Sequence, residues 1–345
     1  MERSRTPTLL SFSLLTLAAR ATQGAWRSRD RVLHQLDGRL PLEFNGCMKT
    51  LLIGMMVALL LVGCGPRPKP RTPPKKVSPV PVNLSTSAVE GKPFTIADLS
   101  MDMLWVNPGT FEMGSPPEEE DRRDRETQHT VTLTEGYWLG KHPVTQAQWQ
   151  KVTWDNPSHF KGANRPVEKV SWTEVTSFCD KLTEMEKKAG RVPKGMAYQL
   201  PTEAQWEYAC RAGTKTAFSF GDSLTFGQAN IRGGPGETVD VGKYPANEWG
   251  FQDMHGNVWE WCQDWYGDYP RGAVRDPVGL ATGASRVARG GSWSSTASSA
   301  RSANRHRYVP TRSYYTMGFR LSLRPTSKGR KTGRKAFAKP SKTAK

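Results

Sequence analysis

Strand-like patterns of apolar and polar residues dominate the first part of the region that we expect to fold. Apolar and polar residues alternate through residues 103–115, on both sides of Pro108-Gly109, and this pattern predicts a β-hairpin that turns at Pro-Gly. Residues 116–128 are polar or charged almost throughout and are expected to form a loop. Residues 131–133 and 137–140 have the composition of two short strands that flank a turn.

Three helices are expected from their N-terminal signals. In a capping box, a Ser or Thr oxygen and a Glu or Gln side chain three residues later satisfy free amides of the first turn. The pattern occurs at Thr145 with Gln148, at Ser171 with Glu174, and at Thr202 with Gln205. The middle helix has apolar residues at helical spacing, namely Val175, Phe178, Cys179, Leu182 and Met185. Gly190 and Gly213 are the expected stops of the second and third helices, and Trp206 is expected to be buried by the third.

Beyond Gly213 the regular patterns fade. Gly and Ser are frequent, the apolar stretches are short, and residues 281–325 alternate only weakly. The chain nevertheless contains 37% hydrophobic residues and 12 tryptophans, which is enough for a hydrophobic core. We therefore expect this half to be a tryptophan-rich body with much irregular backbone and few short strands.

A secretion signal is predicted inside the chain rather than at its first residue. Met48 and Lys49 precede an apolar run, residues 51–62, that is too short for a comfortable membrane span. The run ends in Leu61-Val62-Gly63-Cys64, which resembles a bacterial lipobox, and the prolines that follow prevent a helix from continuing. We predict a lipoprotein signal peptide at residues 48–63 and a lipid anchor on Cys64; the alternative is a short buried helix.

Charge is concentrated at the ends of the chain. The 345 residues carry a net charge of +17, but residues 324–345 contain nine Lys or Arg and no acid, and residues 83–323 are close to neutral. A nucleic-acid groove would place its cations on the folded body, so no nucleic-acid partner is expected.

The chain is accordingly divided into five parts. The globular domain is expected at residues 99–325, with order starting near Leu99. The remaining parts are an over-extended N-terminus (1–47, or else a genuine extension), the signal peptide (48–63), a Pro- and Lys-rich linker (64–98) and a basic disordered tail (326–345).

Seven sequence blocks follow one another in this domain. They are residues 107–115, 141–146, 166–172, 200–209, 256–261, 289–293 and 318–320, and they include Gly256-Asn257-Val258-Trp259-Glu260-Trp261 and Arg289-Gly290-Gly291-Ser292-Trp293. Together they resemble the formylglycine-generating enzyme family, also called sulfatase-modifying factors. The resemblance implies a single globular domain with an irregular α+β fold, related to C-type lectins and often stabilised by calcium.

Calcium ligands are suggested by the residues themselves and by the resemblance. Calcium takes six to eight oxygen ligands, and Asp253 and Glu260 offer carboxylates on either side of Gly256 and Val258, whose carbonyls are available in a tight turn. These four positions match the family's second calcium site; the alternative is that the two acids are ordinary surface residues. Asn230 and Ile231 match the opening of the first site, but the residues that follow lack its acidic pattern.

Copper is not expected. In the family, two cysteines after the Arg-Gly-Gly-Ser turn hold the catalytic copper, whereas this chain has cysteines only at 47, 64, 179, 210 and 262. Residues 294–301 supply hydroxyl and methyl groups, which are poor ligands for Cu(I). Cys179 and Cys210 match family cysteines whose usual partners are missing, so they either bond each other or remain small buried hydrophobes, as Cys262 is expected to do.

Two functions are compatible with these features. The first is a binding or scaffold lipoprotein of the bacterial envelope, anchored through Cys64, without copper oxidase chemistry and with no catalytic residue assigned. Its partner would be an envelope protein, peptide or glycan, and the candidate walls of a groove are Trp259, Trp261, Trp265, Tyr266 and Trp293. The alternative, favoured for most of these five by the usual burial of large aromatic side chains, is that they are core residues. The second is an oxidoreductase of the family that acts on protein cysteine or another substrate with a different metal site.

Overall fold

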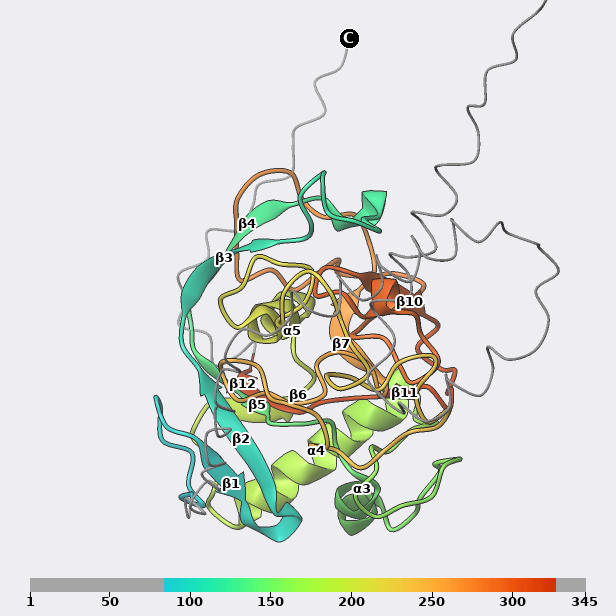
Figure 1. Ribbon diagram of the computed structural model, residues 1–345. Coiled ribbons are helices and arrows are strands. Elements are labelled where there is room, and N and C mark those ends of the chain that lie inside the picture. The colour runs from blue at the N-terminus through green and yellow to red at the C-terminus, as the bar shows by residue number, and fades with distance from the viewer. Residues whose placement is uncertain (1–83, 327–345) are drawn as a thin grey trace, which may run out of the picture. The chain divides into compact units, whose positions relative to one another are not determined.

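The computed structural model describes residues 84–326, which form three sheets with helices packed against them (Figure 1). The five-stranded sheet has the order β1 (Phe94–Ile96), β2 (Met101–Val106), β5 (Tyr137–Gly140), β12 (Ser322–Pro325) and β6 (Met196–Gln199). The four-stranded sheet has the order β10 (Arg305–Tyr308), β9 (Arg286–Arg289), β7 (Trp259–Trp265) and β11 (Met317–Gly318). The three-stranded sheet has the order β3 (Gly109–Met113), β4 (His129–Leu133) and β8 (Val274–Arg275).

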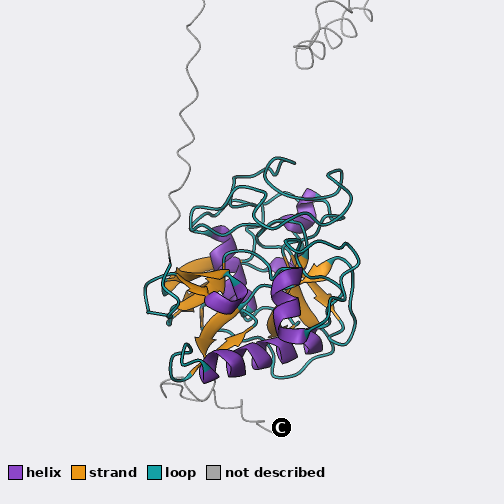
Figure 2. Cartoon of the chain, turned by 90° about the horizontal axis from the view of Figure 1, so that it is seen from below, coloured by secondary structure: helices purple, strands orange, loops and turns teal. Residues whose placement is uncertain are grey.

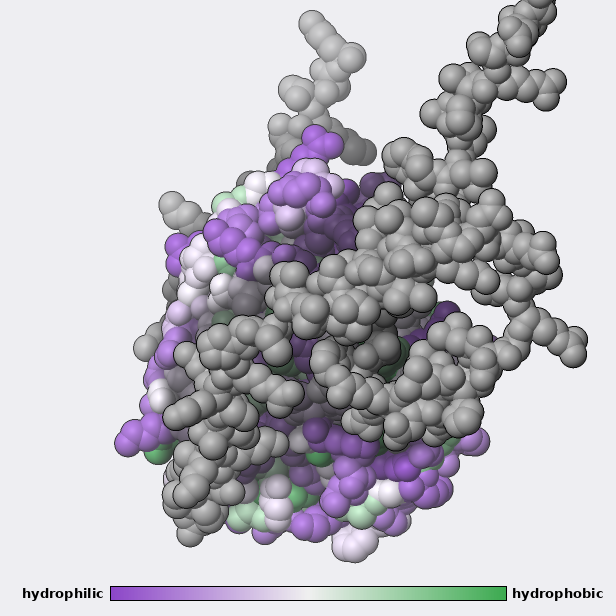
Figure 3. Space-filling model, in the orientation of Figure 1, coloured by the Kyte–Doolittle hydropathy of each residue, from purple (hydrophilic) through white to green (hydrophobic). Residues whose placement is uncertain are grey.

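The predictions for residues 1–83, including the signal peptide and Cys64, lie outside the described residues, as does the tail from residue 327. Within residues 84–326, no helix has both the length and the apolar character needed to cross a membrane. Where described residues form the visible surface, hydrophilic side chains gather over the loop between β3 and β4 (Figure 3).

The folded part begins before Leu99, where order was expected to start. Phe94 and Ile96 of β1 are buried, and β1 pairs antiparallel with the first residues of β2. Phe94 also meets the ring of Trp138 edge to face, with centroids 5.8 Å apart. Part of the segment expected to be a linker therefore belongs to the sheet, because its short apolar-polar-apolar alternation is buried against β2.

The predicted hairpin at Pro108-Gly109 is wrong. β2 pairs with β5 and β3 pairs with β4, all antiparallel, so β2 and β3 run along one side of a long ribbon and β4 and β5 along the other. The charged loop after β3 makes the turn of this ribbon. Pro108 lies where β2 ends and β3 has not yet begun, and because it lacks a backbone N–H it interrupts the hydrogen bonding along that side of the ribbon. The strand predictions at residues 131–133 and 137–140 are confirmed, but these strands do not pair with each other.

All three predicted helices are confirmed together with their caps. Thr145, Ser171 and Thr202 make complete capping boxes at the starts of α3 (Gln146–Thr153), α4 (Trp172–Lys188) and α5 (Glu203–Arg211). Gly190 and Gly213 follow the ends of α4 and α5 with φ of +70° and +92°. Figure 2 shows α4 running along the strands as the longest helix.

One residue of the α4 pattern was placed wrongly. Met185 is 37% exposed, whereas Glu186 is 1% exposed and forms an ion pair with Arg191 at 2.6 Å. The buried stripe continues from Leu182 to Glu186 at a spacing of four residues, which keeps both on one helix face. The ion pair with Arg191 is what allows the Glu186 carboxylate to remain inside.

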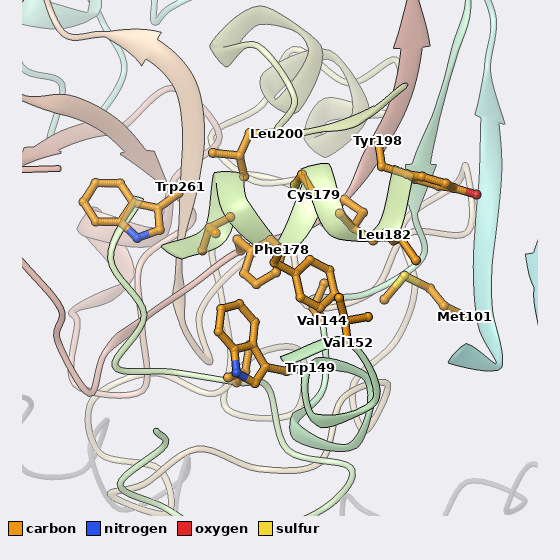
Figure 4. Packing of buried hydrophobic residues seen from close by; sticks show 14 of the residues in the cluster. Met101, Val144, Trp149, Val152, Phe178, Cys179, Leu182, Tyr198, Leu200 and Trp261 are labelled. Carbon is orange, nitrogen blue, oxygen red and sulfur yellow. The ribbon is translucent and has the colours of Figure 1, made fainter. Parts of the chain in front are cut away.

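The core is divided into two main clusters. In the first, Phe178 of α4 stacks on Trp149 of α3, with ring centroids 5.1 Å apart (Figure 4). Phe178 also meets Phe319 edge to face at 5.4 Å. Trp261 lies in the same cluster and is fully buried. The second cluster surrounds Trp206 of α5, which is fully buried as predicted.

The backbone between Arg211 and Trp259 contains no helix or named strand, in agreement with the fading of regular patterns after Gly213. Cys179, Cys210 and Cys262 are free and buried, so the alternative that they remain small hydrophobes is confirmed over the described chain. Burial raises the pKa of the Cys210 thiol to about 12, which keeps it protonated at neutral pH.

Candidate functional site

The Arg289-Gly290-Gly291-Ser292-Trp293 segment makes a tight turn at the end of β9. Gly290 and Gly291 have φ of +91° and +75°, a region that favours glycine. A Cβ on Gly290 would lie 3.1 Å from the carbonyl oxygen of Met254, and one on Gly291 would lie 3.1 Å from Ala300. The two glycines thus let the turn pack between the segment around Met254 and the loop that follows.

Arg289 is completely buried within an ionic cluster. Its guanidinium binds the Glu207 carboxylate, lies 3.3 Å from Glu203, and donates to the carbonyls of Ser302 and Ala303. These carbonyls belong to the segment after residue 301, so Arg289 ties that segment to α5. Because Arg289 is buried and holds this segment in place, it acts as a positioning residue for the site.

Hydroxyl groups occupy the start of the loop at residues 294–301. The Ser292 Oγ lies 3.2 Å from the Ser294 Oγ and 3.1 Å from the Ser295 Oγ, and a short 3-10 helix follows at Ala297–Ala300. The thiol that contacts this region is Cys210, whose Sγ lies 3.6 Å from the Ser302 Oγ. One protonated thiol and several hydroxyls do not fit Cu(I), which prefers soft thiolate or thioether donors.

His255 connects the two sides of the site. Its Nε2 accepts from the backbone N–H of Ser219 at 3.1 Å, so Nδ1 carries the proton and donates to the Ala300 carbonyl at 2.7 Å. Burial lowers the pKa of His255 to about 4, so the ring is neutral at physiological pH. The Ser219 Oγ lies 3.0 Å from the same Nε2. Such a weak base, already engaged by a backbone N–H, holds the loop in place and does not activate the hydroxyl.

The four residues assigned to the second calcium site are all buried. Asp253 has φ of +56° and is 6% exposed; its Oδ2 accepts from the Gly242 N–H at 2.7 Å, but its Oδ1 makes no hydrogen bond within residues 84–326. Glu260 is more fully engaged, because it accepts from Arg320 through both oxygens and from the indole of Trp206. A carboxylate has about four lone-pair sites, so Glu260 retains capacity for one more partner.

The first predicted calcium site is adjacent to the second. Asn230 pairs with Gly256 through a parallel bridge, and its carbonyl accepts from Asn257 at 2.8 Å. The Asn230 Oδ1 is buried without a partner in the described chain, whereas the Ile231 carbonyl already accepts from Gly234. Sequence reasoning missed Thr238, whose buried Oγ1 is also unpaired in this part of the structure. Unpaired oxygens in a buried polar region fit a hard cation such as calcium.

A partly exposed group of aromatic side chains lies beside the loop. We call it the aromatic face: His159, Phe160, Trp293 and Tyr315. The Trp293 ring is 5.4 Å from Phe160 and 5.9 Å from Tyr315, and Tyr315 is 51% exposed. Sequence reasoning had found only Trp293, because the other three come from distant loops that carry no common motif.

The other proposed groove residues do not lie on this face. Trp261 is fully buried in the core and Trp259 is 5% exposed, so for these two the alternative that they are core residues is confirmed. Trp265 packs under the guanidinium of Arg286 and Tyr266 under that of Arg305, at 3.5 Å and 4.6 Å from the ring centroids.

The domain can now be assigned to a family. The sequence model of one protein family, the sulfatase-modifying factor enzyme 1-like domain, matches residues 92–324, and the chain therefore belongs to this family. Its α+β fold, predicted from the sequence blocks, is confirmed. The solved structure of Treponema denticola variable protein 1 is 29% identical and superimposes with a TM-score of 0.61, covering 68% of this chain and 99% of that one. PvdO from Pseudomonas aeruginosa gives 25% identity and a TM-score of 0.59, over 69% of this chain and 99% of that one.

Curated relatives have different names and lengths. A formylglycine-generating enzyme of Streptomyces coelicolor is 33% identical over 206 residues, 54% of this chain and 60% of that protein. Serine/threonine-protein kinase pkn1 of Chlamydia caviae is 32% identical over 241 residues, 65% of this chain. The chain spans only 38% of the length of that chlamydial relative. Membership of the family therefore does not by itself select one activity.

Proposed function

We propose that this protein is an envelope-anchored lipoprotein whose domain binds or positions a partner and does not carry out copper-dependent oxidation. The observation that carries this proposal is the donor set after Arg289. No cysteine follows position 262 in the sequence, and the Ser292 hydroxyl is hydrogen-bonded to the hydroxyls of Ser294 and Ser295. Hard hydroxyl oxygens cannot replace two thiolates as ligands of a monovalent soft metal.

The aromatic face supports the binding role. Exposed aromatic side chains grouped in a patch are typical of contact surfaces, because they bury a large area while losing little conformational entropy. Phe160, Trp293 and Tyr315 lie next to the loop where relatives with cysteines would hold copper. The partner would be a protein, peptide or glycan of the envelope.

Calcium is the cofactor that the residues fit. We propose that Asp253 supplies a carboxylate oxygen, that the carbonyls of Gly256 and Val258 and the remaining capacity of Glu260 contribute, and that Asn230 contributes to an adjacent site. The ion would neutralise buried acidic charge and fix the irregular backbone between α5 and β7.

A direct assay tests the loss of oxidase chemistry. The purified full chain, loaded with copper and supplied with oxygen and a thiol reductant, is mixed with a Cys-x-Pro-x-Arg peptide. We expect no change in peptide mass, because no pair of thiolates is available for copper. The streptomycete formylglycine-generating enzyme under the same conditions is the positive control. Conversion of the peptide cysteine to an aldehyde, read as the corresponding loss of mass, would contradict the proposal and favour the oxidoreductase alternative.

Substitution of Cys64 tests the anchor. In a bacterial host that processes lipoproteins, the wild-type chain is expected to be cleaved before Cys64, to gain acyl chains and to fractionate with membranes, since two or more acyl chains give stable anchoring. Cys64→Ser should lose the acyl mass and leave the membrane fraction. Cys47→Ser is the matched control and should change neither. A mature wild-type protein that still begins upstream of residue 48 would contradict the prediction of a lipid anchor on Cys64.

A further inference from the structure

Three exposed cationic residues border the aromatic face, and we call them the cationic rim: Lys161, Lys169 and Arg232. Lys161 directly follows one member of the face in the sequence. The backbone N–H of Lys169 donates to the carbonyl of Tyr314 at 3.0 Å, one residue before a second member. The Arg232 Nε donates to the carbonyl of Ser294 at 2.9 Å, one residue after a third member. The rim residues are therefore neighbours of the aromatic rings, although they come from two separate loops.

The charges of the rim have no acidic partner at this surface. None of the three residues forms an ion pair with an acid of residues 84–326. The neighbouring acid, Glu168, is fully buried; burial raises the pKa of its carboxyl, and the charges of Lys169 and Lys161 act against that rise. Residues 277–326, which supply two of the four rings of the face, contain no acidic residue. The rim therefore offers positive charge without a competing surface counter-ion from the described residues.

Most hydrogen-bond donors of the rim remain available. Lys161 uses one of its three ammonium N–H groups, on the Asn156 carbonyl at 2.8 Å. The ammonium group of Lys169 makes no hydrogen bond to residues 84–326, and the Arg232 guanidinium uses only its Nε there. The two terminal nitrogens of Arg232 thus keep a planar fork, which matches the two oxygens of a carboxylate.

Hydroxyl groups lie beside the aromatic rings. Trp293 donates its indole N–H to the Tyr315 carbonyl at 3.5 Å, so its polar atom is already engaged and its ring offers apolar surface. Ser294, Ser295 and Thr296 follow Trp293 directly, and Thr296 is exposed. A hydroxyl donates one hydrogen bond and accepts two, so hydroxyls that bind one another keep capacity for a ligand. The surface therefore combines aromatic rings, hydroxyls and unpaired cations.

This combination selects among the possible partners. The apolar C–H face of a sugar ring packs on an aromatic ring, sugar hydroxyls pair with protein hydroxyls, and a sugar carboxylate pairs with lysine or arginine. An acidic peptide would use the cations but has no need of the hydroxyl-rich loop. A nucleic acid requires many cations on the folded body, and residues 83–323 are close to neutral.

We propose that the aromatic face and its cationic rim bind an acidic glycan, a sugar chain that carries carboxylates. A sugar ring would lie on Trp293 and Tyr315, and carboxylates on neighbouring sugars would reach the rim. This inference rests on the binding role proposed above for the aromatic face, and it adds the chemical class of the partner.

Calorimetric titration of the full chain tests the proposal with oligomers of galacturonate, mannuronate and hyaluronate. We expect saturable binding of at least one of them. Its methyl ester should bind at least about tenfold more weakly, because the ester keeps the sugar rings and loses the charges. Added sodium chloride should weaken binding of the acid form more than that of the ester, since the rim is exposed and its charges are screened.

Variants of the face and of the rim should each weaken glycan binding about tenfold or more. They are Trp293→Leu and the double variant Lys161→Gln/Lys169→Asn, in which asparagine suits the φ of +59° at position 169. The matched controls are Trp154→Leu, at a tryptophan that is 87% exposed, and Lys188→Gln, at the last residue of α4. Both controls should bind as the wild type does.

Polyglutamate and a single-stranded thymidylate oligomer test the two other classes of partner. The basic ends of the chain are the same in every variant, so binding through them should not change in Trp293→Leu. A loss of polyglutamate or thymidylate binding in Trp293→Leu as large as the loss of glycan binding would overturn the proposal. So would the absence of binding by all three acidic glycans, or equal affinity for the ester.

Near-ultraviolet circular dichroism checks that each variant is folded. If Trp293→Leu fails to fold, Tyr315→Leu replaces it, at a ring that is 51% exposed, and glycan binding should still fall. Failure of the proposed function is read separately, by aldehyde formation in the peptide assay, which does not depend on any glycan.

Discussion

Arg289→Met is expected to destabilise the domain by about 3–5 kcal/mol, a large fraction of the roughly 5–15 kcal/mol that stabilises an ordinary domain. The substitution leaves the carboxylates of Glu203 and Glu207 in the interior without this arginine, although Glu203 still contacts Arg305 at 2.6 Å and Glu207 still contacts Arg211 at 2.9 Å. It also removes the donors of the Ser302 and Ala303 carbonyls. Urea denaturation followed by tryptophan fluorescence measures the change.

The matched control is Arg312→Met, at an exposed arginine in the loop after β10, where a change within about 0.5 kcal/mol is expected. The double variant Arg289→Met/Glu207→Gln separates charge from packing. It should be less destabilised than the sum of its two single variants, because one uncompensated carboxylate is removed with its partner. A folded Arg289→Met protein with a wild-type midpoint would contradict this account of the cluster.

Local signals explain why the helices were predictable. A capping box is contained within four residues, and the buried stripe of α4 repeats along a single element, so both can be recognised without tertiary information. The pairing of β2 with β5, in contrast, depends on residues more than thirty positions apart in the chain. Pro108-Gly109 has the composition of a turn, yet the ribbon continues past it because β3 finds its partner in β4.

The candidate site was likewise predictable only where the signal is local in the sequence. The lack of a thiol pair after Arg289 can be read from the sequence, because it requires only an inventory of side chains. The hydrogen-bond partners of Glu260 cannot be read from the sequence, since Trp206 and Arg320 lie 54 and 60 residues away from it in the chain.

Calcium is expected to raise the thermal midpoint of the wild-type protein at neutral pH and to do so much less in acid. A ligand present at 100 times its dissociation constant stabilises the folded state by about 2.7 kcal/mol. Burial raises the pKa of Asp253 to about 6, above the value of about 3.9 for an unfolded aspartate. Without calcium, the folded state therefore holds more protons than the unfolded state between these values, and stability falls as pH rises through this window. Calcium stabilises the ionised form, so its effect should grow over the same window and be full above about pH 7.

Asp253→Asn removes the charge of the carboxylate while keeping the turn, since asparagine tolerates the positive φ at this position and can still accept a hydrogen bond from the Gly242 N–H. The calcium-free variant should be more stable than calcium-free wild type at neutral pH, because a buried charge is gone, and calcium should no longer shift its midpoint. Asp222→Asn, at an exposed acid, is the control and should keep the wild-type response. Magnesium should substitute poorly, because it demands a tighter octahedral shell than mixed carboxylate and carbonyl oxygens provide. A wild-type midpoint that is the same with chelator and with millimolar calcium at neutral pH would exclude the ion, and would leave Asp253 as a buried acid held by Gly242 and the field of Arg320.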